Sequence, residues 1–291
     1  MIARTGSLPD MVRDVAIVTD STAYLDPHVA AERGIAVVPL QVVVDGRSMA
    51  EGREIGPATV AAALRRHERV STSQPGPRAF LDAYESAAAS GASAIVSVHL
   101  SGQLSGTVDV ARLAARDAAV PVEVIDSGSL GMGLGFAALA AADAADRGLA
   151  ADEVAAEARR RAANSSAYFY VDTLDYLRRG GRIGAGQALL GTALAVKPLL
   201  YLQNGAIQLL EKVRTSSRAV GRLEDLAVAR ALDDPVDVAV HHLANASRAD
   251  ELAARLRARI PMLGELVVTE VGAVIGAHVG PGLLAVIVSP R

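Results

Sequence analysis

The sequence predicts an α/β protein of two domains, with a largely parallel sheet flanked by helices in the first and a mixed or antiparallel sheet in the second. Over the first 165 residues, short β-branched runs alternate with helical patterns, which is typical of a parallel sheet with helices on both faces. Further along, strand patterns follow one another directly, which indicates antiparallel neighbours. We therefore expect two domains, residues 1–165 and residues 166–291.

The composition excludes several classes of protein. The 291 residues carry a net charge of −3 and only 3% are aromatic, so neither a basic surface nor stacking platforms for nucleic acid are expected. Without cysteine the chain forms no disulfide or thiolate site, and no metal-ligand spacing such as His-Glu-x-x-His occurs. We expect no metal and no cofactor. Because the start has no apolar signal-peptide core, we expect a cytoplasmic protein.

In the first domain, a β-branched run at 15–19 predicts the first strand. Asp26-Pro27 opens a helix, because Asp is a favoured N-cap and Pro fits the first helical position. The further elements expected in this domain are an apolar run at 35–44, a helix at 57–67, a polar loop at 70–77, a helix at 78–89, a strand at 94–100, a helix at 108–117, a strand at 122–125, an uncharged Gly/Ala-rich helix at 128–142 and a surface helix at 152–163.

In the second domain, Asn204-Gly205 predicts a hairpin between strands at 199–202 and 206–213, because Asn-Gly is the strongest short turn signal. Residues 271–290 carry no formal charge, but central glycines and a proline favour strand, loop, strand over a membrane span. The other elements expected here are a strand at 168–171, an uncharged helix at 184–196, a helix at 215–231, a strand at 236–241, a helix at 249–259, and final strands at 273–277 and 283–288.

The clearest candidate binding element is the polar loop Ser101–Thr107, which follows the strand at 94–100 and precedes a helix. Such a loop presents hydroxyls and free backbone N–H groups at the end of a strand, where ligands of open α/β sheets bind. The positive end of the helix dipole favours an anion such as a phosphate or carboxylate. The alternative for Ser105 is a plain N-cap of the helix.

Recognised enzyme motifs are missing from the sequence. Ser101 or Ser105 could pair with His99 or His278 in a hydrolase, but no Gly-x-Ser-x-Gly elbow occurs. The adjacent pair His241-His242 would point to opposite faces of a strand, which is a poor arrangement for binding one metal ion. These observations favour a binding protein.

Several short strings together resemble one family, the DegV (fatty-acid-binding) proteins. They occur in the family's order over nearly the whole chain: Val18-Thr19-Asp20-Ser21-Thr22, Thr72-Ser73-Gln74-Pro75, Leu104-Ser105-Gly106-Thr107, Val124-Ile125-Asp126-Ser127, Val171-Asp172-Thr173-Leu174-Asp175-Tyr176-Leu177, Gly180-Gly181-Arg182-Ile183, Lys197-Pro198, Lys212-Val213-Arg214-Thr215 and His278-Val279-Gly280-Pro281-Gly282. Each string is weak evidence alone, but the ordered set is specific.

This resemblance implies a lipid tunnel between the two domains that holds one long-chain fatty acid of about C14 to C18. It implies that Thr72 and Ser105 contact the carboxylate. The head-group network that it implies around them consists of His278, Arg214, Ser101, Gly106 and Thr107. The uncharged helices at 128–142 and 184–196 are candidate tunnel walls.

The resemblance also implies a role. The protein would be a carrier and not a catalyst, presenting the bound acid to a separate fatty acid kinase that makes acyl-phosphate. A transient contact of the protein with a membrane is compatible with this role. Arg178, Arg179 and Arg182 form a basic group that is either a kinase-docking surface or an ordinary solvated face. Two rival functions stay open: a hydrolase using Ser105 and His278, and a structural or regulatory protein whose lipid does not exchange.

Overall fold

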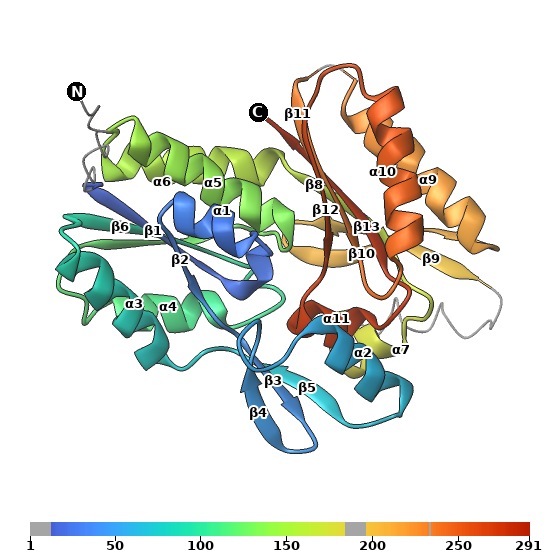
Figure 1. The fold of residues 1–291 in the computed structure, drawn as a ribbon, viewed down its shortest axis with the longest axis horizontal. Coiled ribbons are helices and arrows are strands. Elements are labelled where there is room, and N and C mark those ends of the chain that lie inside the picture. The colour runs from blue at the N-terminus through green and yellow to red at the C-terminus, as the bar shows by residue number, and fades with distance from the viewer. Residues whose placement is uncertain (1–12, 184–195, 233) are drawn as a thin grey trace, which may run out of the picture.

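The computed structural model describes residues 13–183, 196–232 and 234–291. Its first half contains a parallel four-stranded sheet in the order β2-β1-β6-β7. Helices α5 and α6 cover one face of this sheet, and α3 and α4 cover the other (Figure 1). The elements are β1 (Val15–Asp20), α1 (Pro27–Glu32), β2 (Ile35–Val38), α3 (Pro77–Ala89), β6 (Ala94–His99), α4 (Thr107–Ala115), β7 (Val122–Asp126), α5 (Met132–Asp146) and α6 (Ala151–Asn164).

A second, antiparallel sheet of three strands corrects two expectations. It consists of β4 (Arg47–Ala50), β3 (Gln41–Val44) and β5 (Val70–Ser73), and α2 (Pro57–Arg65) connects β4 to β5. The apolar run at 35–44 is therefore two strands in different sheets, separated at Pro39, whose missing N–H cannot continue a ladder. The expected loop at 70–77 begins as a strand, so Thr72 is held opposite Val42 in the β3–β5 register.

The second half forms a six-stranded mixed sheet in the order β10-β9-β8-β13-β11-β12, in which only β11 and β12 are parallel. The Asn204-Gly205 hairpin is confirmed, with both residues at positive φ. The bounds are β8 (Ser166–Tyr170), α7 (Asp175–Arg179), β9 (Lys197–Gln203), β10 (Ala206–Val213), α9 (Ser216–Arg230), β11 (Val236–His242), α10 (Ala246–Arg259), β12 (Leu263–Glu270), α11 (Ala273–Val279) and β13 (Leu284–Pro290). Strand β12 was not predicted, and nearly all of the helix expected at 184–196 lies outside the described residues.

Helix α11 overturns the strand expected at 273–277. All of its residues except His278 are buried, so residues 273–277 form an unbroken apolar run without the periodicity that distinguishes a helix from a strand. It packs against α2, α7 and β5 (Figure 1), elements from both halves of the chain. Gly280, at φ 72, ends it. Across the described ranges, no helix is both long and apolar enough to cross a membrane.

Candidate functional site

A cavity of about 80 Å³ lies where both halves of the chain meet; we call it the polar cavity. Thr72 reaches it from β5, Ser105 from the loop before α4, and His278 from α11. Ser73, Gln74 and Arg182 complete its polar lining. The structure thus brings together three residues that the sequence predicts for one site, although they are far apart in the chain.

A second cavity of about 40 Å³ adjoins the first; we call it the apolar cavity. Leu130, Ile275 and Val279 line both cavities. On the far side, alternate residues of β8 and β13 form the wall, since every second side chain of a strand points to the same face. These wall residues are Ala167, Phe169, Ala285 and Ile287. The uncharged helix expected at 128–142 begins at Met132, and Leu130 and Gly131 just before it reach this cavity.

In the polar cavity, Thr72 Oγ1 and His278 Nε2 share a hydrogen bond of 2.7 Å. Burial, with a smaller contribution from the nearby Arg182 charge, lowers the pKa of His278 to about 4. The imidazole is therefore neutral at pH 7, with one ring nitrogen a donor and the other an acceptor. A hydroxyl and a neutral imidazole together offer both donors and acceptors to a ligand.

The loop before α4 presents Ser105 next to Thr107, and their hydroxyls are 2.8 Å apart. The N-cap of α4 is Gly106, and no side chain caps this helix end. The interpretation of Ser105 as an N-cap is therefore wrong. Gly106 lies directly against Gln74, whose amide would be about 3.3 Å from a Cβ at that position.

Two other residues predicted for this network lie elsewhere. Ser101 is fully buried, and its hydroxyl donates to the carbonyl of Gly205 at 2.7 Å, so it ties the loop to the β9–β10 hairpin. Arg214 is exposed just after β10 and is not among the residues that line the polar cavity. Ser101 thus supports the loop that carries Ser105, and Arg214 lies outside the lining of the polar cavity.

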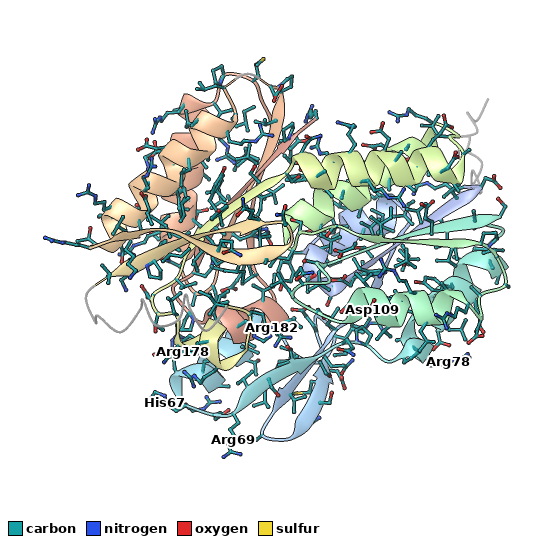
Figure 2. All side chains as sticks on the ribbon, turned by 180° about the vertical axis from the view of Figure 1, so that it is seen from behind. His67, Arg69, Arg78, Asp109, Arg178 and Arg182 are labelled. Carbon is teal, nitrogen blue, oxygen red and sulfur yellow. The ribbon has the colours of Figure 1, made fainter. Side chains whose placement is uncertain are left out.

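The basic group Arg178, Arg179 and Arg182 divides in two. Arg178 is exposed and pairs with Asp175 at 2.7 Å, and Figure 2 shows it to the left of Arg182. Arg179 lies over the Tyr176 ring at 5.0 Å. Arg182 is half-buried, lines the polar cavity and donates from Nε to the Leu104 carbonyl at 3.1 Å. The expectation of one exposed group is therefore wrong for Arg182.

Outside the two cavities, three buried side chains are arranged like the catalytic triad of a hydrolase. Ser97 Oγ is 2.7 Å from His99 Nε2, and His99 Nδ1 is 3.1 Å from Asp20 Oδ2. All three side chains are fully buried, and the hydroxyl of Tyr84 lies 2.9 Å from Ser97. Burial raises the pKa of Tyr84 to about 12. No hydrogen bond within the described part of the chain joins Ser105 to His278, the pair that a hydrolase would use.

Sequence reasoning missed two residues near the polar cavity. Gln74 belongs to a motif that carries the family resemblance, so its proximity to Thr72 was a usable signal. Glu51 lies on a short turn after β4 and has no sequence signal. Its buried carboxylate accepts hydrogen bonds from the Val274 backbone and the Ser21 hydroxyl, and so holds the start of α11.

The fold and the two joined cavities define an α/β protein with a site that is polar at one end and apolar at the other. The family model described as "Uncharacterised protein, DegV family" matches residues 14–291. The chain belongs to the DegV family, which confirms the resemblance seen in the sequence.

Relatives and solved structures agree with this assignment. The DegV domain-containing protein SCO2569 of Streptomyces coelicolor is 59% identical over 281 residues, covering 97% of this chain and 100% of that protein. A DegV family protein from Thermus thermophilus, described for its fatty acid binding, superposes with a TM-score of 0.90 at 32% identity and covers 96% of this chain and 100% of its own. DegV of Bacillus subtilis, described as a fatty acid binding protein, gives 0.87 at 33% identity, with coverage of 96% and 100%.

Proposed function

We propose that the protein binds one long-chain fatty acid, with the carboxylate in the polar cavity and the tail directed through the apolar cavity. The walls of the apolar cavity must separate to hold the tail, because a C16 chain is larger than the 40 Å³ present. The observation that carries the proposal is the shared lining of the two cavities by Leu130, Ile275 and Val279, which joins a polar end to an apolar one. The fatty acid binding described for the T. thermophilus and B. subtilis relatives supports it.

The polar cavity offers what a buried carboxylate needs. An unpaired buried charge is very costly, so its oxygens must accept several hydrogen bonds. The hydroxyls of Thr72 and Ser105 are two donors, and the amide of Gln74 is a third. The guanidinium of Arg182 supplies opposite charge, which strengthens such hydrogen bonds.

The tail supplies most of the binding free energy. Burial of apolar carbon is worth about 0.8 kcal/mol per methylene, so a C16 chain offers on the order of 10 kcal/mol before the costs of ordering. Every side chain that lines the apolar cavity is apolar except the imidazole of His241, and burial lowers the pKa of that group to about 4. The histidine is therefore uncharged beside the alkyl chain.

We further propose that the protein is a carrier that presents the acid to a separate fatty acid kinase, as the family resemblance implies. The exposed Arg178 and Arg179 are the proposed docking residues. Acyl-phosphate would be trapped as hydroxamate after incubation of lipid-loaded protein, ATP and a bacterial fatty acid kinase catalytic protein. Arg178→Glu with Arg179→Glu should lower its yield without lowering the lipid content, and an unchanged yield would remove these residues from the docking surface.

The first experiment is native mass spectrometry of the purified protein, followed by extraction and identification of its lipid. We expect one fatty acid per chain, reduced at least tenfold in Thr72→Val and Ser105→Ala. Thr59→Val and Ser48→Ala are the matched controls, because both residues are exposed and lie outside the polar cavity. Wild-type protein that is empty and takes up no added C14 to C18 acid would refute the proposal.

The two rival functions give different outcomes in the same preparation. A hydrolase using Ser105 would be labelled covalently at that residue by a fluorophosphonate. A protein that holds lipid only as part of its core would not exchange it for isotope-labelled palmitate over hours. Exchange without labelling supports the carrier.

A further inference from the structure

The apolar cavity ends at a small cluster of buried side chains, which we call the dividing wall. Its members are Met132, Phe136, Ala167, Ala239 and Ile287. Ala167 and Ile287 line the apolar cavity, whereas Met132 and Phe136 line a separate hollow on the protein surface. One layer of side chains therefore separates the cavity from the outside.

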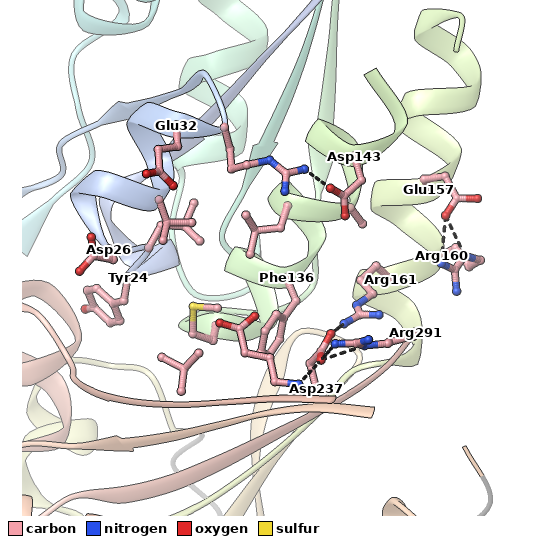
Figure 3. A pocket seen from close by; sticks show the side chains of 18 of the residues that line it. Tyr24, Asp26, Glu32, Phe136, Asp143, Glu157, Arg160, Arg161, Asp237 and Arg291 are labelled. Atoms are coloured by element: carbon pink, nitrogen blue, oxygen red, sulfur yellow. Dashed lines mark hydrogen bonds and ion pairs between the residues drawn. The ribbon is translucent and has the colours of Figure 1, made fainter. Parts of the chain in front are cut away.

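The surface hollow, which we call the outer groove, has a volume of about 660 Å³. Figure 3 shows Phe136 pointing from α5 toward its centre, with Tyr24 on one side and the buried pair Arg161 and Asp237 on the other. Its apolar lining continues that of the dividing wall, through Leu25, Val29, Leu139 and Val267. The outer groove thus has an apolar floor next to the dividing wall, whereas most of its remaining lining is charged, as at Arg33, Asp143 and Arg160.

The backbone fixes the dividing wall tightly. The N–H of Met132 donates to Nε2 of His241 at 2.9 Å. Gly131, at φ 60, permits this approach, because a Cβ there would lie 2.9 Å from the same nitrogen. A Cβ on Gly135 would lie 2.8 Å from the Met132 sulfur, so the thioether packs directly on α5. Met132 therefore has little room to move aside for a longer ligand.

We propose that the dividing wall sets the longest acyl chain that the protein accepts, and that a longer chain would emerge into the outer groove if the wall were opened. The inference rests on the proposed fatty-acid function and adds the residues that select among fatty acids. Each methylene favours binding only while there is space for it, and forcing further ones against a close-packed wall is unfavourable. The longest acyl chain is then set by two residues of the dividing wall: Ala167, which faces the apolar cavity, and Met132, which faces the outer groove.

Two substitutions should move the preference in opposite directions. Met132→Ala removes the thioether between the apolar cavity and the outer groove, which should admit longer chains. Ala167→Leu fills the cavity end and should favour shorter ones. Met262→Ala is the matched control for the first, because Met262 is 41% exposed and lies outside both cavities and the outer groove.

The experiment offers delipidated protein an equimolar mixture of saturated acids from C12 to C22 and measures the bound distribution by native mass spectrometry. We expect the ratio of C20 to C16 to rise at least tenfold in Met132→Ala and to stay unchanged in Met262→Ala, and the ratio of C14 to C16 to rise in Ala167→Leu. Circular dichroism identifies variants that do not fold. If one of the two does not fold, Ile287→Val is measured in its place, and we expect this variant to prefer longer or bulkier tails.

The outcomes separate the two proposals. Wild-type protein that binds none of the acids overturns the proposed function itself. Wild-type protein that binds acids, together with folded wall variants that keep its distribution, overturns the role of the dividing wall and leaves fatty-acid binding standing.

Discussion

The Glu51 carboxylate accepts a hydrogen bond of 2.7 Å from the backbone N–H of Val274, 223 residues further along the chain. The Ser21 hydroxyl donates to the other carboxylate oxygen. Burial raises the pKa of Glu51, while these two hydrogen bonds lower it by a smaller amount. Glu51 thereby fixes the start of α11, the helix that carries His278 to Thr72.

Glu51→Ala should lower both stability and lipid affinity. It leaves the Val274 N–H buried without a partner, which costs roughly 2 kcal/mol in the free energy of unfolding. Glu51→Gln keeps an acceptor and should cost less. Urea denaturation and titration with a fluorescent fatty acid measure the two effects, with the exposed Glu32→Gln as the control. Equal stabilities of wild type and Glu51→Ala would contradict this role.

Gly205→Ala should be more harmful than Gly46→Ala. Both glycines follow a positive-φ residue in a two-residue turn, at φ 79 and φ 84, so an alanine is strained by about 1 kcal/mol in either. Only at Gly205 would the new Cβ also meet the Ser101 hydroxyl, at 2.4 Å, whereas Gly46 faces open space.

The comparison of these two variants isolates the contact with Ser101. Gly205→Ala should lose at least about 1 kcal/mol more in the free energy of unfolding than Gly46→Ala. Because the Ser101 loop leads to Ser105, its fatty acid affinity should also fall. Similar losses in the two variants would show that the hairpin does not support this loop.

Arg182→Met should weaken the binding of fatty acids but not of fatty alcohols. Arg182 lines the polar cavity, so its positive charge can pair with a carboxylate but gains little from a neutral hydroxyl. We expect about a tenfold or larger rise in Kd for palmitate. Competition with a fluorescent lipid measures both ligands, with the exposed Arg178→Met as the control. A parallel loss of palmitate and hexadecanol binding would assign Arg182 a packing role only.

Lowering the pH from 7 to 4 should destabilise the protein through His278. The pKa of this group is about 4 in the folded protein against 6.5 ordinarily, so the unfolded chain binds more protons between these values. Its contribution is fully present above pH 6.5 and is lost as the pH falls toward 4, on the order of 1 to 3 kcal/mol.

A variant separates this effect from that of the other titrating groups. His278→Gln should show a shallower decline of unfolding free energy over this pH range than wild type, whereas His28→Gln, on the exposed face of α1, should match wild type. Parallel curves for wild type and His278→Gln would show that His278 is not buried as the structure has it.

The sequence was most informative where local signals are strong. Asp26-Pro27 opens α1 as predicted, and Asn204-Gly205 forms the predicted hairpin, because capping and turn geometry depend on a few adjacent residues. It was least informative at α11 and at β5, where the tertiary environment decides. Glu51 holds α11 as a helix from a distant turn, and pairing with β3 converts the expected loop around Thr72 into a strand.

The candidate site divides in the same way. The family motifs pointed to Thr72, Ser105 and His278, which do line one cavity. The motifs did not indicate that Arg182 points into the cavity while Arg178 faces solvent. Adjacent positions in a sequence do not determine the direction in which each side chain points. The dividing wall was equally invisible, since Met132 and Ala167 have no motif of their own.

Scanning structures for three-residue catalytic templates would place this protein among the hydrolases. Asp20, His99 and Ser97 meet at 3.1 and 2.7 Å, with the imidazole nitrogens assigned as in a serine protease. A template stores only residue types and distances, and it does not ask whether a substrate could arrive. Here the Ser97 hydroxyl has no exposed surface, so such a scan must also test solvent access to avoid assigning hydrolase activity to this protein.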